Sequence, residues 1–354
     1  MKNSIKILYL YSEIMGYNLS TIKNLIKSGA EVFLVHWDKN KLANYKLIDI
    51  DGLNVYPRSE MSYRKLLKLA SELNPDITVV SGWLDRDYTR IARYLKYQNK
   101  IVVCCFDNNY KMNLKTIILR IGVKLGIMSR FFSHFWIPGY PQFEYLKKIG
   151  INYSKIIYEM YSADNQLFDK IFSNTINIKK DQYPRNFIYL GRFAEEKGLH
   201  TLINAWSALG NEKNGWQLKV IGNGKLKYLF ENFDDIKVKE FVQPENLEEE
   251  IKDAGCFILP SLKDNWGVVV HELAAAGLPL IISDGVGAKS TFLINGYNGY
   301  EFQRGNEKSL IKNMKKIINT SDESLYDMGL NSNKMSKRVS SETSSHQLLS
   351  LLEK

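Results

Sequence analysis

The 354-residue sequence has few cysteines and no long apolar run. Its three cysteines, Cys104, Cys105 and Cys256, are too few for a disulfide framework, and two are adjacent in an apolar stretch, which is typical of reduced core thiols. No segment reaches the roughly 18 uncharged apolar residues of a membrane span. The amino terminus shows no signal-peptide pattern, so we expect a cytoplasmic protein.

Acidic residues are absent from Asn108 to Phe143, a stretch rich in Ile, Leu and Phe. Residues 1–160 hold 24 Lys and Arg against 13 Asp and Glu, whereas residues 161–354 hold 24 against 25. Two interpretations are open. The basic half contacts an anionic membrane surface, or the stretch forms a largely buried helix, because its cations scatter around a helix at 100° per residue. These cations are Lys111, Lys115, Arg120, Lys124 and Arg130.

Short apolar runs alternate with helical stretches along the whole chain. IKILYLY, ITVVSGW and IVVCCFD occur in the first half, and FIYL, QLKVIGNG and CFILPS in the second. This alternation predicts α/β architecture with parallel sheets covered on both faces, and the length favours two domains. We expect domains at 1–165 and 185–335, a linker at 166–184, and a C-terminal helix at 336–354 that packs back on the first domain.

The segment GRFAEEKG begins at Gly191, directly after the strand-like run FIYL. Backbone N–H groups at the carboxyl end of a parallel strand face the crevice where α/β sheets bind ligands. Arg192 can bind two phosphate oxygens and Lys197 can add a second charge, so the pair could neutralise a diphosphate without a metal. Taken alone, the segment is equally compatible with a solvated turn.

Two further stretches follow predicted strands. Gly222 and Gly224 lack a Cβ, so a ligand could approach the backbone there, although a tight turn also explains them. The stretch DNWGVVVHE places Asp264 and Glu272 eight positions apart. Asp264 or Asn265 is expected to cap a helix that continues through HELAAA. Glu272 could then accept hydrogen bonds from sugar hydroxyls, or it could be a surface acid.

In order and spacing, four segments resemble the C-terminal half of retaining glycosyltransferases of family 4, which have the GT-B fold. They are GRFAEEKG, IGNGK, the run from FVQPENLEEEI to LPLIISD, and INGYNGYEF. The resemblance covers residues 130–315 well and residues 1–130 only in layout. It implies two Rossmann-like domains that face a central cleft. It also implies retaining transfer of a hexose from a UDP- or GDP-linked donor, with no metal or other cofactor.

The resemblance assigns roles to matching residues. Arg192 and Lys197 match the diphosphate clamp, and Glu272 matches the acid that binds the ribose. Asp264 stands where the family usually has glutamate in contact with the donor sugar, which leaves the identity of that sugar open. The remaining donor-site positions implied are Gly191, Gly222, Gly224, Val242 for the base, and the backbone of Trp266, Gly267, Val268 and Val269; Gly16 is what remains of the family's glycine-rich first loop.

The acceptor side is less well defined. No histidine matches the family's acceptor-side histidine, and the corresponding run is VVCCFDNNY. A basic, aromatic first half together with the resemblance implies a saccharide or lipid-diphosphate-linked saccharide acceptor. The expected setting is bacterial surface polysaccharide synthesis, such as O-antigen of lipopolysaccharide or capsule, with the enzyme cytoplasmic or peripheral at the inner face of the membrane.

Other functions are weighed on particular residues. Asp85 and Asp87, in the sequence DRD, could hold a metal in a GT-A transferase. A GT-B nucleotide-sugar epimerase shares the same layout. An NAD-dependent dehydrogenase is disfavoured because no G-x-G-x-x-G follows a strand. Nucleic acid is not an expected partner, since the second half is not basic and carries no recognition motif.

Overall fold

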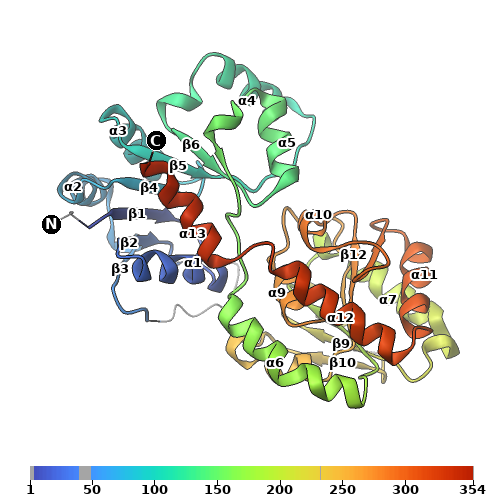
Figure 1. The fold of residues 1–354 in the computed structure, drawn as a ribbon. Helices are drawn as coiled ribbons and strands as arrows, with labels where there is room; N and C mark the ends of the chain where they lie inside the picture. The colour runs from blue at the N-terminus through green and yellow to red at the C-terminus, as the bar shows by residue number, and fades with distance from the viewer. Residues whose placement is uncertain (1–3, 40–48, 232, 354) are drawn as a thin grey trace. The chain divides into compact units, whose positions relative to one another are not determined.

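The computed structural model describes residues 4–39, 49–231 and 233–353. The chain forms two compact units, Met1–Ser162 with Val339–Lys354, and Ala163–Arg338. Each unit contains a parallel β-sheet with helices on both sides, as Figure 1 shows. The prediction of two Rossmann-like α/β domains is therefore confirmed.

The first unit is built on a seven-stranded sheet of order β3-β2-β1-β4-β5-β6-β7, in which the described pairings are parallel. Apart from the partly exposed edge strand β3, its strands are apolar and are buried on both faces by two hydrophobic clusters. The strands are β1 (Lys6–Tyr11), β2 (Glu31–His36), β3 (Leu53–Pro57), β4 (Ile77–Val80), β5 (Ile101–Cys105), β6 (His134–Trp136) and β7 (Ile156–Ile157). The helices are α1 (Gly16–Lys27), α2 (Tyr63–Leu73), α3 (Arg86–Tyr97), α4 (Leu114–Lys124) and α5 (Tyr140–Ile149).

The end of the chain returns to the first unit as α13 (Ser341–Leu349), which packs along α1 (Figure 1). Two polar contacts align the helices: Thr21 Oγ1 with Ser344 Oγ at 3.2 Å, and Asn24 Nδ2 with Ser341 Oγ at 2.7 Å. Leu348 is fully buried in the core of this unit. The expected packing of the C-terminal helix on the first domain is confirmed.

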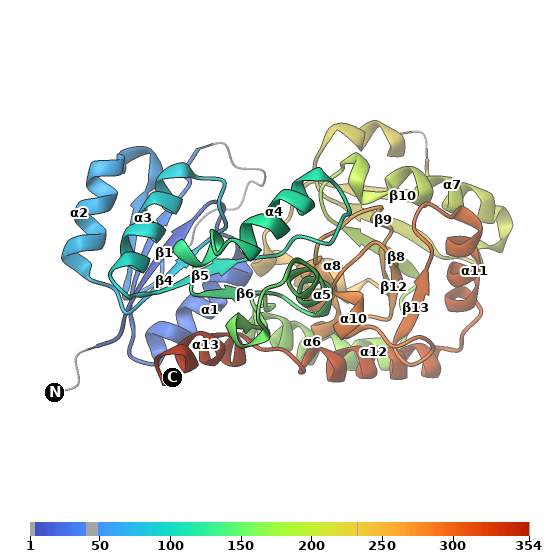
Figure 2. The same ribbon diagram turned by 90° about the horizontal axis from the view of Figure 1, so that it is seen from above.

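The second unit has a six-stranded sheet of order β10-β9-β8-β11-β12-β13, again parallel in its described pairings. Helices α7 and α11 pack together, and α6 and α12 lie side by side (Figure 2), with α9 packed on both of them. The strands are β8 (Asn186–Leu190), β9 (Gln217–Ile221), β10 (Ile236–Lys239), β11 (Cys256–Leu259), β12 (Leu280–Ser283) and β13 (Gly299–Phe302). The helices are α6 (Asn165–Asp181), α7 (Leu199–Leu209), α8 (Glu248–Lys252), α9 (Val268–Ala275), α10 (Lys289–Phe292), α11 (Glu307–Ile318) and α12 (Asp322–Ser336).

Two sequence expectations differ from the structure. The segment 166–184, expected as a linker, holds most of α6, which packs on α8, α9 and α12 within the second unit. The alternative of a largely buried helix within residues 108–143 is wrong, because α4 exposes most of its side chains, Ile118 by 61%. The three cysteines are buried free thiols, as expected.

The strand order reverses beside β8, since β9 lies on one side of it and β11 on the other. Loops that leave such a reversal point run in opposite directions and open a crevice at the carboxyl ends of the strands, where α/β sheets bind their ligands. The second unit therefore presents its expected ligand site where β8 and β11 end.

The buried face of α13 predicts a clear difference between two leucines of the same tail. Leu348→Ala leaves a cavity in the hydrophobic core of the first unit, so we expect a loss of about 2–5 kcal/mol in the free energy of unfolding. Leu352, which is 37% exposed, is the matched control, and its replacement by Ala should cost less than about 0.5 kcal/mol. Denaturant unfolding of both variants measures this, and equal losses would contradict the packing of α13.

Candidate functional site

An ion pair joins the two loops at the reversal point of the second unit. Lys197 Nζ donates to Asp264 Oδ2 at 2.6 Å, and the two side chains are only 16% and 13% exposed. Lys197 belongs to the loop after β8 and Asp264 to the loop after β11. The structure thus brings together two of the predicted site residues, one cationic and one anionic, from segments 67 positions apart.

The backbones of the loops after β8 and β9 lie in close contact. A Cβ on Gly222 would lie 1.9 Å from the carbonyl oxygen of Gly191, and one on Gly224 would lie 2.2 Å from that of Phe193. Both contacts are sterically impossible for any residue with a side chain. Gly222 and Gly224 are therefore required for this close approach of two loops.

The loop after β11 is held on the loop after β8 in the same way. A Cβ on Gly198 would lie 2.1 Å from the carbonyl oxygen of Pro260, and the φ of Gly198 is +68°. Nearby, the backbone N–H of Leu262 donates to the carbonyl oxygen of Glu196 at 2.9 Å. These contacts fix the distance between the backbones that carry Lys197 and Asp264.

Helix α9 begins without a side-chain cap, although Asp264 or Asn265 was expected to cap it. Its N-cap is Gly267, with a φ of 86°, and no side chain accepts from the first turn. Among the residues that the structure describes, no acceptor is found for the backbone N–H groups of Gly267, Val268 and Val269. The capping prediction is therefore wrong, and its failure leaves the positive end of the helix open to an anion.

The loop after β12 supports Asp264 from the other side. The N–H of Asp264 donates to the carbonyl oxygen of Gly285 at 3.0 Å, and its own carbonyl oxygen accepts from the N–H of Gly287 at 3.2 Å. A Cβ on Gly287 would lie 2.3 Å from the carbonyl oxygen of Asn265. These two glycines are not among the predicted site residues, although they follow the strand-like run LPLIISD.

Arg192 lies on the loop after β8 but has a different partner from Lys197. Its guanidinium donates to Glu196 Oε1 at 2.7 Å, and its side chain is 47% exposed. The hydroxyl of buried Tyr189 donates to the carbonyl oxygen of Arg192 at 2.7 Å. Burial raises the pKa of Tyr189 well above its ordinary value, with Asp264 adding to the effect. Tyr189 and Glu196 are positioning groups that the sequence analysis missed.

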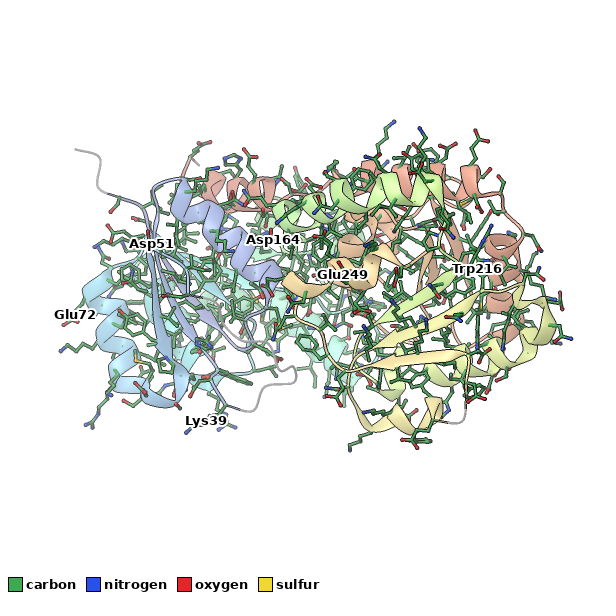
Figure 3. The ribbon with its side chains drawn as sticks, turned by 90° about the horizontal axis from the view of Figure 1, so that it is seen from below. Lys39, Asp51, Glu72, Asp164, Trp216 and Glu249 are labelled. Atoms are coloured by element: carbon green, nitrogen blue, oxygen red, sulfur yellow. The ribbon has the colours of Figure 1, made fainter. Side chains whose placement is uncertain are left out.

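Glu272 lies one turn after the start of α9 and is half-buried. Desolvation, with repulsion from the carboxylate of Asp164, raises the pKa of Glu272 to about 7. Asp164 caps α6 by accepting from the N–H of Leu167 at 3.2 Å and is labelled in Figure 3. Because Glu272 forms no ion pair among the described residues, its carboxyl group is free to bind hydroxyl groups of a ligand.

Three other predicted site residues occupy different places. Val242 follows the edge strand β10 and is half-buried. Trp266 is buried, with its ring 6.4 Å from that of Phe292, so its side chain belongs to the core and only its backbone is near the start of α9. Gly16 is the first residue of α1 in the other unit, and the structure does not group it with the residues above.

The first unit presents polar groups where β5 ends, in the run VVCCFDNNY. Phe106 is buried, whereas Asp107 is half-buried and its carboxylate accepts from the hydroxyl of Tyr161 at 3.4 Å. Gln142 donates to the carbonyl oxygen of Asp107 at 3.0 Å. The sequence has no histidine here, and no pattern in it predicted this cluster.

The DRD sequence is occupied by a protein cation. Arg58 binds Asp85 at 2.8 Å and Asp87 at 2.9 Å, and Asp85 also accepts from the indole N–H of Trp37 at 3.1 Å. Among the described residues, no group of three His, Cys, Asp or Glu side chains could hold a metal ion. Arg90 also pairs with Asp87 at 3.5 Å, so two protein cations already balance the two carboxylates, and these contacts argue against the GT-A alternative.

Comparison with known families places the site in a known type of domain. Residues 173–335 match the family described as "Glycosyl transferases group 1". Capsular polysaccharide biosynthesis glycosyltransferase CapM of Staphylococcus aureus is 27% identical over 183 residues, which are 49% of this chain and 45% of the relative. Putative colanic acid biosynthesis glycosyltransferase WcaL of Salmonella typhimurium is 26% identical over 149 residues, 38% of this chain and 36% of the relative. The chain thus spans less than half the length of these two relatives.

Solved structures share the whole fold at low sequence identity. Anabaena Alr3699/HepE in complex with UDP and glucose has a TM-score of 0.72 and 15% identity, with 99% of both chains covered. WaaG, a glycosyltransferase involved in lipopolysaccharide biosynthesis, has a TM-score of 0.69 and 12% identity, with 97% of this chain and 98% of that chain covered. These likenesses confirm the GT-B fold.

Because the pKa of Glu272 is raised, replacing its carboxyl group with a neutral amide should stabilise the folded protein more at high pH than at low pH. The folded state favours the protonated acid, so wild-type stability is lost as pH rises from about 4.5 to about 7. Glu272→Gln removes this loss, so the Tm of the variant minus the Tm of wild type should be larger at pH 8 than at pH 5. Each kcal/mol of unfolding free energy gained corresponds to about 2–4 °C in Tm. Thermal unfolding at both pH values measures it.

Glu249→Gln is the matched control, because Glu249 is an exposed acid on α8 of the same unit (Figure 3). Its Tm should follow wild type at both pH values. If Glu272→Gln and Glu249→Gln behave alike, the carboxyl group of Glu272 is not desolvated.

Proposed function

We propose that the protein is a retaining glycosyltransferase that moves a hexose from a nucleoside-diphosphate sugar to a saccharide acceptor. The observation that carries this proposal is the Lys197–Asp264 pair beside the uncapped start of α9. The site thus combines a cation, a carboxylate and open N–H groups. The cation can bind a diphosphate, the carboxylate can bind sugar hydroxyls, and the N–H groups can bind phosphate oxygens.

Each group has a place in the proposed reaction. Glu272 binds the ribose hydroxyls, and Asp264 contacts the hexose. Lys197, Arg192 and the N–H groups of Val268 and Val269 bind the diphosphate. As the bond to the hexose breaks, negative charge grows on the leaving phosphate, and these donors stabilise it in the transition state.

Asp264 also prepares the site before the donor arrives. Its contact with Lys197 holds the ammonium group in place in a half-buried environment, so little reorganisation is needed when phosphate oxygens bind. Arg192 is exposed and can leave Glu196 at low cost, because surface ion pairs contribute about 0–1 kcal/mol.

The resemblance and the relatives support a proposal for the class of donor and acceptor. HepE is described in complex with UDP and with UDP-glucose, and CapM and WcaL are named for capsular polysaccharide and colanic acid biosynthesis. We therefore propose a UDP- or GDP-linked hexose as donor, and an acceptor of surface polysaccharide synthesis, either free or linked to a lipid diphosphate. Two protein cations and a helix end can neutralise the diphosphate, so we expect transfer without a metal.

The two cations provide the direct test. Lys197→Ala and Arg192→Ala should each lower kcat by roughly 10²-fold or more, the usual effect of losing one transition-state donor. The assay follows release of nucleoside diphosphate from UDP- and GDP-hexoses with an oligosaccharide acceptor panel in the presence of EDTA. Lys263→Ala is the matched control, since Lys263 is an exposed lysine on the loop after β11.

Near-wild-type rates in both cation variants, with wild-type Tm, would refute the diphosphate clamp. Conversion of the donor to its epimerised nucleoside-diphosphate sugar, with no net release of nucleoside diphosphate and no transfer to any acceptor, would instead support the GT-B epimerase alternative. Loss of activity in EDTA that Mg²⁺ restores would refute metal independence.

A surface on the first unit fits a lipid-linked acceptor. On α4, the exposed side chains of Leu114, Ile117, Ile118 and Ile121 are 51–70% exposed. At 100° per residue they fall within an arc of roughly 100°, so they form one apolar stripe. A stripe of four large aliphatic side chains in water is unfavourable for an isolated molecule and marks an interaction surface.

Basic residues border this stripe on both sides. Lys115 lies on one flank, and Arg120 and Lys124 lie on the other, and all three are exposed. None of them forms an ion pair within the described parts of the chain. An apolar stripe between unpaired cations is the arrangement that inserts into the acyl boundary of an anionic bilayer while its cations bind headgroups.

We therefore propose that the protein is peripheral at an anionic membrane surface through α4. No helix among residues 4–39, 49–231 and 233–353 is both long and apolar enough to cross a bilayer. Contact through one helix face is compatible with that finding, because such a face inserts only about 5–10 Å.

Vesicle sedimentation tests the membrane contact. Wild type should bind vesicles that contain anionic lipid, and binding should fall as salt is raised. Replacement of Ile117, Ile118 and Ile121 by Ser should lower the bound fraction at least tenfold, since about 0.8 kcal/mol is lost for each buried CH₂.

The charge control lies in the second unit. Lys308, Lys312 and Lys316 are exposed on one face of α11, without an apolar stripe of exposed residues beside them. Their replacement by Gln should leave binding unchanged, whereas replacement of Lys115, Arg120 and Lys124 by Gln should abolish its salt dependence. Wild-type protein that stays in the supernatant at low salt would refute the membrane contact.

A further inference from the structure

One fully buried histidine stands outside the proposed chemistry. His271 lies on α9, directly before Glu272, with its ring stacked 4.3 Å from that of Phe292. Its Nδ1 accepts from the backbone N–H of Ala163 at 2.9 Å, and its Nε2 lies 3.0 Å from the carbonyl oxygen of Ser336. Because Nδ1 accepts, the ring is neutral and Nε2 carries the proton that is donated to Ser336.

The two partners of this ring lie where the chain passes between the two units. The first unit ends at Ser162, so Ala163 is the first residue of the second. Ser336 is the last residue of α12, and the chain re-enters the first unit at Val339. One side chain thus contacts the backbone at both chain passages.

The same helix carries the proposed donor site. The open N–H groups of Gly267, Val268 and Val269 lie four, three and two residues before His271, and Glu272 is the next residue. Other contacts join α9, α12 and α6, the helices next to the passages. Asn333 Nδ2 donates to the carbonyl oxygen of Ala275 at 2.5 Å, and Lys337 pairs with Asp169 of α6. Helices α6, α9 and α12 therefore form one block around the imidazole.

We infer that His271 is a positioning residue that anchors both chain passages to the donor-binding helix. A rotation at the passages moves distant atoms of a unit by several times the displacement at the hinge. A misplacement of about 1 Å between reacting groups costs on the order of 10²-fold in rate. The effect of this anchoring on turnover rests on the proposed transferase function, whereas the anchoring itself does not.

Three substitutions separate the two hydrogen bonds. His271→Phe keeps a ring against Phe292 and removes both bonds. His271→Asn places an amide oxygen near the position of Nδ1 and can keep the bond from Ala163. His271→Gln places an amide N–H₂ near the position of Nε2 and can keep the bond to Ser336. His200→Phe, on the surface of α7, is the matched control.

Hydrogen exchange of the backbone amides at the two passages measures the anchoring directly. In His271→Phe, the amide of Ala163 and the amides of residues 337–340 should exchange at least tenfold faster than in wild type. His271→Asn should restore protection at Ala163 alone, and His271→Gln at residues 337–340 alone. His200→Phe should match wild type. Equal protection of Ala163 in all variants, or its loss in His271→Asn, would overturn the inference.

Kinetics test the consequence for turnover. His271→Phe should change the Kd of UDP or GDP, whichever stabilises wild type in a thermal-shift titration, by less than about threefold while kcat falls at least tenfold. A purely structural role would lower Tm and leave kcat per folded molecule unchanged. If His271→Phe does not fold, the Asn and Gln variants still decide between anchoring and packing. If wild type transfers no sugar, the transferase proposal fails and the exchange data still decide the anchoring.

Discussion

The close approach of four loops at the carboxyl edge of the second sheet is the constraint on which the site depends. Gly198, Gly222 and Gly287 each lie against a carbonyl oxygen at a distance that no Cβ could occupy. That backbone packing lets Lys197 and Asp264 meet at 2.6 Å although they come from different loops. It also places the turn at Gly267 so that α9 starts without a cap. A side chain at any of these glycines would separate the loops and with them the charges.

The same region lacks stabilising interactions that a helix start and a carboxylate normally have. The first N–H groups of α9 have no acceptor within the described chain, and Glu272 lies beside another acid, Asp164, in place of a cation. Unsatisfied donors and desolvated carboxylates are unfavourable in the free protein, and an anionic, hydroxyl-rich ligand would satisfy both. A nucleoside-diphosphate sugar has both kinds of group, and this match is the physical reason to prefer it over a purely structural interpretation of the pattern.

Sequence patterns predicted the central strands of both sheets and the segments that carry the site, because buried parallel strands are continuous apolar runs. They missed the edge strands β3, β7 and β13, of which β3 is partly exposed and β7 is two residues long. Sequence patterns also failed where they could not show which partner a side chain has or which face of a helix is buried. Asp264 was expected to cap α9, but it binds Lys197, which the sequence could not place beside it. On α6, Lys179 faces inward with Phe168 and Ile171, so a polar residue interrupts the apolar spacing, and the sequence pattern indicates a linker where the structure has a helix. On α4, Leu119 and Val123 pack on the core while the exposed stripe lies opposite. The basic residues mark the borders between two apolar faces, so they appeared scattered.

His271 and Glu272 show how neighbouring buried groups can hide each other's effect. Burial lowers the pKa of His271 to about 4, so the fold favours its neutral form and stability is lost as pH falls below about 6.5. Desolvation raises the pKa of Glu272 to about 7, so the fold favours its protonated form and stability is lost as pH rises above about 4.5. Between about pH 4.5 and 6.5 the two slopes have opposite signs and partly cancel. A flat stability profile there would therefore reflect two opposed titrations on adjacent residues of α9, and single substitutions are needed to separate them.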